Sequence, residues 1–241
     1  MTVGLATTIA ARALILLGLG VSARAHDIIT TSITFDKEIV RIIHARCARC
    51  HREGGSAFSL MTYKEARPWA QAIKEETLSR RMPPWGAVKG FGEFRNDEAL
   101  SNEQIETIVG WIDGGVPEGD EATLPPAPTF PASKPALPKP QTIVTDRGYV
   151  LTRAMNLDGL IPLAAPQHTS MQIIAVLPDG NVTPLVWLDT FQEKFRHAFL
   201  LETPVLLPAG TRIEGLTAGA KIGLLQAPNP KQSRVRERPV E

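Results

Sequence analysis

The chain has only two cysteines among its 241 residues, and they lie three positions apart, at Cys47 and Cys50. A disulfide-stabilised secreted scaffold uses more cysteines at wider spacings, so this pair needs a local explanation. An excess of one charge is also missing, because 26 basic residues face 25 acidic ones. No basic stripe and no acidic tract stands out, so no nucleic-acid partner is expected.

The apolar run near the N-terminus, residues 13–21, is shorter than the roughly 20 apolar residues that span a bilayer. Arg12 precedes it, and residues 23–25 (Ala-Arg-Ala) fit the small-x-small cleavage rule. We therefore expect residues 1–25 to be a signal peptide and the protein to be exported to the periplasm. The alternative is an uncleaved membrane anchor at residues 3–21, and only that alternative predicts membrane association.

Composition divides the remaining chain into parts. Residues 26–118 contain both cysteines and helix-like patterns, whereas residues 117–140 hold eight prolines and predict an extended linker at 119–140. Residues 141–228 change to short β-rich runs, and residues 229–241 are polar, charged and expected to be disordered. The expected fold class is multidomain, with an all-α domain followed by an all-β sandwich or jelly-roll domain.

Two helical patterns flank the cysteine pair. Residues 35–45 have apolar side chains at helical spacing, with Thr34 available as an N-cap. A second helix is predicted at residues 63–79, where Pro68 must lie in the first turn or mark the true start.

The third helical pattern is the clearest. Ser101 and Gln104 fit a capping box at its start, and Gly114 and Gly115 are expected to end it. Its predicted apolar face consists of Ile105, Ile108, Val109, Trp111 and Ile112.

Short β-rich runs follow the proline-rich segment. They are predicted at residues 141–144, 149–157, 171–177, 183–188, 198–202, 205–207, 212–216 and 221–226. Residues 178–181 (Pro-Asp-Gly-Asn) predict a hairpin turn between two of them. Eight short strands at this spacing are typical of a β-sandwich or jelly roll.

The run Cys47-Ala48-Arg49-Cys50-His51 has the C-x-x-C-H pattern of covalent haem c attachment. Two thiols three residues apart lie on one side of a helical turn, where they can form thioethers with the two haem vinyl groups, and the next residue supplies an imidazole for the iron. A thioredoxin-like disulfide and half of a zinc site are the rival interpretations. The zinc site would need two more ligands, and His44 is the only other one nearby. Export, a preceding helix and the adjacent His51 favour haem.

Residues 33–115 resemble a class I monohaem cytochrome c domain, in which a helix enters the C-x-x-C-H motif and a Met-Pro segment precedes the last helix. The resemblance implies one covalent haem c, with Cys47 and Cys50 attached and His51 and Met82 as axial iron ligands. The chain departs from the family at the helix crossing, where Ile39 and Ile43 occupy positions that are often glycine and aromatic. It also lacks the usual proline whose carbonyl accepts the ring N–H of the ligand histidine.

Several further residues invite a haem or metal role. Met61 is the alternative sixth ligand, although it follows His51 so closely that a packing role suits it better. Cleavage after residue 25 would leave His26 as a terminal copper chelator, but a chance terminal histidine is the expected interpretation. The other residues are assigned to the haem pocket or its propionates, or more simply to core and surface: His44, Trp69, Trp85, Arg80 and Arg81.

Residues 184–214 resemble part of the C-terminal β-domain of copper type II ascorbate-dependent monooxygenase relatives. The copper site of those enzymes uses several histidines and a methionine. This part of the chain has fewer candidates for metal ligands: Met155, His168, Met171 and His197. A docking or scaffold role is therefore the expected one.

Together these patterns favour an electron carrier over an enzyme, with redox proteins that the sequence does not identify as its partners. The first alternative is a haem-linked oxidoreductase with a substrate or copper site on the β-domain. The second is a redox sensor or assembly subunit whose haem only reports redox state.

Overall fold

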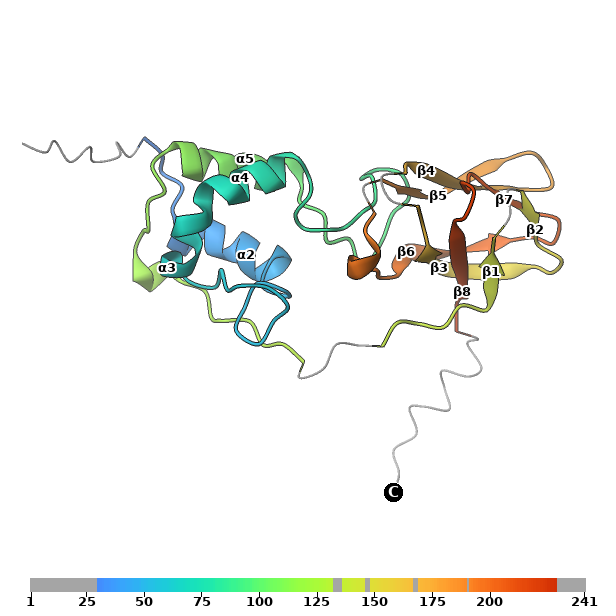
Figure 1. Ribbon diagram of the computed structural model, residues 1–241, viewed down its shortest axis with the longest axis horizontal. Coiled ribbons are helices and arrows are strands. Elements are labelled where there is room, and N and C mark those ends of the chain that lie inside the picture. Colours follow the sequence, from blue (N-terminus) through green and yellow to red (C-terminus); the bar gives the residue numbers. More distant parts are fainter. Residues whose placement is uncertain (1–29, 132–135, 146–147, 167–168, 190, 229–241) are drawn as a thin grey trace, which may run out of the picture.

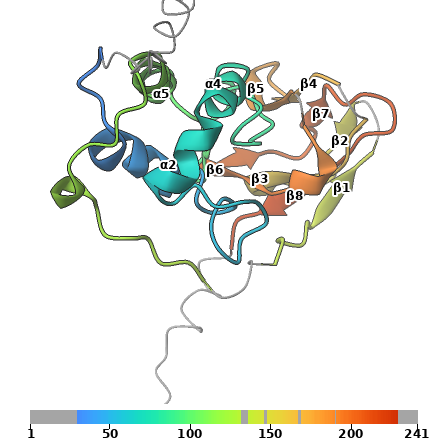
Figure 2. The same cartoon turned by 60° about the vertical axis from the view of Figure 1, so that its left-hand side comes forward.

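The computed structural model describes residues 30–131, 136–145, 148–166, 169–189 and 191–228. Short helices gather at one end of the molecule, and two β-sheets form the other end (Figures 1 and 2). The signal peptide at 1–25, His26 and the tail at 229–241 lie outside the described residues. Within them, no helix is long and apolar enough to cross a membrane.

The helical end is built from segments shorter than the sequence predicts. The first is a π-helical turn, Phe35–Ile39, that continues into α2 (Val40–Arg46). Pro68 lies in a 3-10 turn, Arg67–Trp69, which separates α3 (Tyr63–Ala66) from α4 (Ala70–Leu78). A proline cannot continue the α-helical hydrogen bonds, so the expected second helix is divided at this point.

The last helix, α5 (Asn102–Asp113), is the longest and buries Trp111. The Trp111 ring packs against Phe35, with centroids 6.0 Å apart, and Phe35 in turn meets Tyr63 at 5.8 Å. The indole Nε1 of Trp111 donates a hydrogen bond to the carbonyl oxygen of Pro117 at 2.9 Å, so the buried N–H is satisfied. These contacts join the first and last helices of this end.

The predicted capping box of α5 is confirmed. Gln104 N donates to Ser101 Oγ at 3.1 Å, and Ser101 N donates to Gln104 Oε1 at 3.0 Å. Ser101→Ala leaves backbone N–H groups at the helix start without their side-chain acceptor. It should lower the free energy of unfolding by about 1 kcal/mol, measured by urea denaturation. Glu106→Ala, an exposed change in the same helix, is the control and should change it by less than about 0.5 kcal/mol; equal effects would contradict the capping role.

Two four-stranded antiparallel sheets form the other end of the molecule, with strand orders β1-β8-β3-β6 and β2-β7-β4-β5. The strands are β1 (Thr142–Val144), β2 (Tyr149–Val150), β3 (Met155–Ala164), β4 (Met171–Val176), β5 (Val182–Leu188), β6 (Phe199–Leu207), β7 (Arg212–Glu214) and β8 (Lys221–Gln226). The turn at 178–181 joins β4 to β5, which pair antiparallel as predicted. The two runs predicted at 198–202 and 205–207 form one strand, β6.

A single apolar core lies between the two sheets and draws side chains from both. Leu157, Leu160 and Leu224 come from the first sheet, and Ile173 and Leu188 from the second; all are fully buried. The same core contains Trp85, which precedes the strands by more than fifty residues. The β-sandwich is therefore completed by a segment from the first half of the chain.

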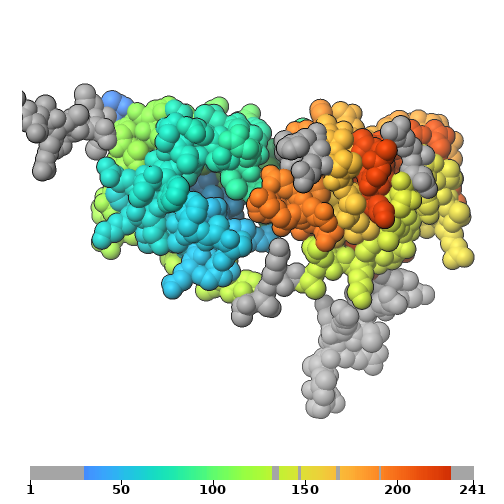
Figure 3. Space-filling model, in the orientation of Figure 1, coloured from blue at the N-terminus to red at the C-terminus, as the bar shows by residue number. Residues whose placement is uncertain are grey.

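The expectation of an all-α cytochrome c-like domain followed by an all-β domain is wrong. Helix accounts for 24% of the described residues and strand for 26%, in two antiparallel sheets, so the part of the chain that the structure describes is mostly β. The physical reason lies in residues 85–99, which the sequence assigns to the helical domain but which contain no helix. This segment is hydrogen-bonded to β6, because Arg95 N donates to Leu200 O at 3.0 Å and Glu202 N donates to Glu93 O at 2.8 Å. In the space-filling view the helical end and the sandwich touch (Figure 3).

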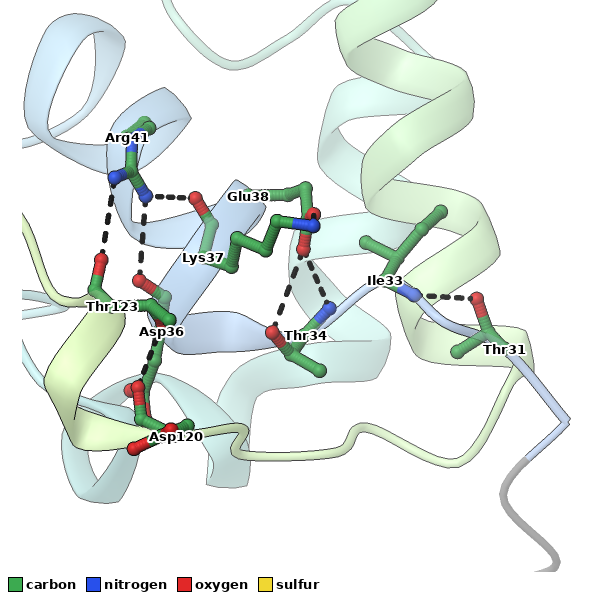
Figure 4. A network of polar contacts seen from close by, with 9 residues as sticks. All are labelled: Thr31, Ile33, Thr34, Asp36, Lys37, Glu38, Arg41, Asp120 and Thr123. Atoms are coloured by element: carbon green, nitrogen blue, oxygen red, sulfur yellow. Dashed lines mark hydrogen bonds and ion pairs between the residues drawn. The ribbon is translucent and has the colours of Figure 1, made fainter.

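An acidic group is buried where the first helical turn meets the segment after α5. The side chain of Asp36 is 4% exposed and points toward Asp120 (Figure 4). Burial raises the pKa of Asp36, and the negative charges of Glu118, Glu121 and Asp120 raise it further. Arg41 lies beside the group and donates to the carbonyl oxygen of Lys37.

This raised pKa predicts a pH-dependent stability. The folded state holds the Asp36 proton more tightly than the unfolded state, so this contribution favours folding at low pH and is lost as pH rises through the folded pKa. Asp36→Asn should therefore raise the free energy of unfolding at pH 7. The gain should disappear near pH 3, below the pKa of about 3.9 of a free aspartate. Urea denaturation at both pH values measures it, and a gain of equal size at both would contradict this assignment.

Candidate haem-attachment site

The C-x-x-C-H motif lies where α2 ends. Cys47 N donates to Ile43 O at 2.8 Å as the C-cap of the helix, and His51 N donates to Cys47 O at 2.9 Å. The chain thus turns once more after the helix, and both cysteines are partly exposed and free. Two free thiols on one turn, followed at once by an imidazole, form the donor set that covalent haem attachment requires.

The loop after His51 folds back over the motif. Ala57 N donates to Cys50 O at 3.1 Å, and Leu60 N donates to His51 O at 3.2 Å. Gly55 permits this return, because a Cβ atom at that position would lie 2.2 Å from the Cys50 carbonyl oxygen. The glycine is therefore required by close backbone approach.

The imidazole of His51 is held by this loop. Its Nδ1 lies 3.0 Å from the carbonyl oxygen of Phe58. A carbonyl oxygen can only accept, so Nδ1 carries the proton and Nε2 keeps its lone pair for a metal. The chain therefore offers a backbone carbonyl, that of Phe58, to the ring N–H of His51. The sequence did not single out Phe58, because any backbone carbonyl can serve in this way.

Two aromatic rings lie beside His51 on the protein surface. The Phe58 ring meets the imidazole edge to face at 4.9 Å and stacks on Trp69 at 4.4 Å. Phe58 is 49% exposed and Trp69 45% exposed. Trp69 therefore lies near the motif but outside the buried core.

The Cys47 thiol differs from a redox-active thiol. Burial raises the pKa of Cys47 to about 12, and the neighbouring Cys50 raises it as well. A thioredoxin-like pair depends on a lowered thiol pKa. The pKa of Cys47 is shifted in the opposite direction.

Met82 lies apart from the motif along the chain and lines a cavity of about 680 Å³. The cavity also touches Leu100 and Ile105 from the helical end and Asp189 from the sandwich end. Cys47, Cys50 and His51 are not among its lining residues. The structure thus brings the three motif residues together and places Met82 at a separate cavity.

Residues 97–100 contact both the surroundings of the attachment motif and the Met82 cavity. Arg46, at the end of α2, donates to the carbonyl oxygen of Asp97 at 2.6 Å, and Arg49 of the motif forms an ion pair with Glu98. The following residue, Ala99, lines the cavity of Met82. One short segment therefore contacts the attachment motif and the cavity in succession.

The other candidates near the motif have local partners. His44 is hydrogen-bonded to the backbone of Met61, and burial lowers the pKa of its imidazole. Arg80 donates to Asn102 Oδ1 at 2.6 Å, and Arg81 makes a two-pronged contact with Glu76 at 2.8 and 2.9 Å. That ion pair lowers the pKa of Glu76.

Three of the four candidate copper ligands lie within the described residues, and each has its own local contacts. Met155 is part of the sandwich core, and the sulfur of Met171 accepts from Thr217 Oγ1 at 2.9 Å. His197 Nδ1 lies 3.0 Å from the Phe195 carbonyl oxygen, and its ring stacks on Trp85. His168 lies outside the described residues.

Across the described residues, no group of three or more His, Cys, Asp or Glu side chains is arranged to hold a metal ion. The sequence also gave no sign that Trp85 would dock in the sandwich, because its ring partners are distant in the chain.

Comparison of the chain with protein-family models, curated proteins and solved structures gave no match.

Proposed function

We propose that this protein is an exported electron carrier that binds one haem c through Cys47 and Cys50, with His51 and Met82 as the axial ligands. The observation that carries the proposal is the hydrogen bond of His51 Nδ1 to the Phe58 carbonyl, beside two thiols on one turn. It leaves Nε2 as the ligand atom of a neutral imidazole.

Each part of the chain has a defined task in this proposal. The thiols of Cys47 and Cys50 would hold the haem through two thioether bonds, which would prevent its loss. Bound haem supplies a one-electron couple between ferrous and ferric states. The Phe58 carbonyl keeps the His51 ring oriented and raises its basicity, and a thioether from Met82 favours the ferrous state.

Electrochemistry of the full-length protein with its bound haem tests the carrier function. We expect one reversible one-electron wave whose current stays proportional to the amount of protein when small organic reductants are added. Catalytic current with such a reductant would favour the haem-linked oxidoreductase instead.

Metal content separates the same two functions independently. Anaerobically purified protein is expected to contain one iron and no copper per chain. One iron together with one copper would favour an enzyme that uses the β-sandwich for substrate chemistry.

A further inference from the structure

The segment Met82-Pro83-Pro84-Trp85 connects the helical end to the sandwich and is held at both of its ends. On the helical side, Met82 N donates to the carbonyl oxygen of Glu76 at 3.1 Å. On the other side, Trp85 is 4% exposed and belongs to the sandwich core. Only two prolines, whose φ angles are fixed by their rings, separate the predicted iron ligand from this buried indole.

The Trp85 ring is enclosed by three other aromatic side chains. It stacks on His197 with centroids 4.7 Å apart and an interplanar angle of 22°. It meets Phe199 at 4.9 Å and Phe94 at 5.8 Å, both edge to face. Edge-to-face and stacked pairs of this kind stabilise beyond the burial of their area, so the indole has a strongly preferred position.

The backbone beyond Trp85 is fixed to the end of β5. Gly86 O accepts from Asp189 N at 3.1 Å, and Val88 N donates to Trp187 O at 2.9 Å. Ala87 and Leu188 form an antiparallel bridge between these two bonds. The chain therefore gains strand-like pairing within five residues of Met82.

Met82 and Trp85 both line the cavity of about 680 Å³, together with Leu100 and Ile105 from the helical end. We infer that Trp85 is a positioning residue, which docks in the β-sandwich and thereby holds the Met82 thioether in place as an iron ligand. This inference rests on the proposed function. It assigns to the sandwich the task of keeping the sixth ligand bound.

The physical basis is pre-organisation. A thioether is a weak ligand, so its occupancy of the iron depends on how much conformational freedom its loop has when it is unbound. Removing the indole gives residues 82–85 more conformational freedom. It therefore raises the fraction of molecules in which Met82 is not bound to the iron. An added ligand that competes with Met82 then binds more tightly in proportion to that fraction.

The test uses full-length protein with haem attached and compares wild type with Trp85→Ala and Trp85→Phe. Ferric Met/His haems show a weak near-infrared band at about 700 nm. Trp85→Ala should keep covalent haem, weaken or lose this band, and bind imidazole about tenfold more tightly. Trp85→Phe keeps an aromatic ring in the pocket and should restore most of the band.

Leu207→Ala is the control. Leu207 is fully buried in the same core, at the end of β6 opposite Phe199, and does not line the cavity. It should lower stability while leaving the band and the imidazole affinity unchanged. If Trp85→Ala does not fold, Trp85→Leu takes its place in the comparison.

An unchanged band and imidazole affinity in the folded Trp85 variant would overturn the inference, and so would an equal effect in Leu207→Ala. Wild-type protein that binds covalent haem but lacks the band would overturn it too, because Met82 would not be a ligand. Wild-type protein without covalent haem contradicts the proposed function itself, so the two failures are distinguishable.

Discussion

Phe199→Ala should lower the free energy of unfolding by about 3–5 kcal/mol, the range for removing a buried aromatic ring from a core. Phe199 is 0% exposed and contacts the rings of Trp85, Phe94 and His197, with centroids 4.9, 5.6 and 4.6 Å away. Its loss leaves a cavity between the sandwich and the segment 85–99. Urea denaturation followed by circular dichroism measures the change.

Leu206→Ala is the matched control for this prediction. Leu206 lies on the same strand, β6, but is 66% exposed. Its truncation should change stability by less than about 0.5 kcal/mol. Similar losses in the two variants would show that residues 85–99 are not bound to the sandwich through Phe199.

Met82→Ala should abolish the near-infrared band at about 700 nm of the ferric protein, because that band arises from sulfur coordinated to iron. It should also open the site to added ligands. The reduction potential should fall by more than about 100 mV, within the roughly 0.8 V range that haem axial ligands span. Optical spectroscopy and a redox titration of the full-length protein measure these changes.

Met61→Ala is the control for the sixth ligand. The Met61 backbone is hydrogen-bonded to His44, on the side of the motif, and Met61 is not among the residues that line the Met82 cavity. Its removal should leave the band intact. Loss of the band in Met61→Ala but not in Met82→Ala would identify Met61 as the ligand. Retention of the band in both variants would exclude both methionines.

Local sequence patterns were sufficient to place most elements. The capping box at Ser101 and the hairpin at 178–181 depend on neighbours within four residues, and both are present. Strand β4 shows the period-two burial that its sequence predicts, whereas β8 buries four residues in succession. Pro68 was expected in the first turn or at the start of one helix over residues 63–79, but the structure has a 3-10 turn at Pro68 that separates α3 from α4.

The fold class failed where distant contacts decide the structure. Trp85 and Phe94 are separated by glycines and lack helical or strand periodicity, so their sequence resembles an ordinary loop of a helical domain. Their partners, Phe199 and His197, follow about a hundred residues later. No local rule predicts such a pairing, and the resemblance to a cytochrome c domain assigned this segment to the helical part, whereas Trp85 packs in the sandwich core.

Haem attachment at Cys47, Cys50 and His51 stays a prediction, which the sequence supplies because the three residues of the motif are contiguous. The orientation of His51 could not be predicted, since it depends on a loop that closes through Gly55 and on the Phe58 carbonyl. The sequence likewise gave Met82 as a ligand only through a family resemblance. The structure shows that Met82 lines a cavity together with residues from both ends of the molecule, which the resemblance did not predict.

The central claim is that Cys47 and Cys50 hold haem covalently, and the most direct measurement is made on denatured, exported full-length protein. We predict that the polypeptide keeps its haem after acid-acetone extraction and gives the pyridine haemochrome spectrum of two thioether bonds. Cys47→Ala and Cys50→Ala should each shift that spectrum to the form with one thioether, and the double variant should lose its haem on extraction. Haem that is extracted from the wild-type protein would contradict the account.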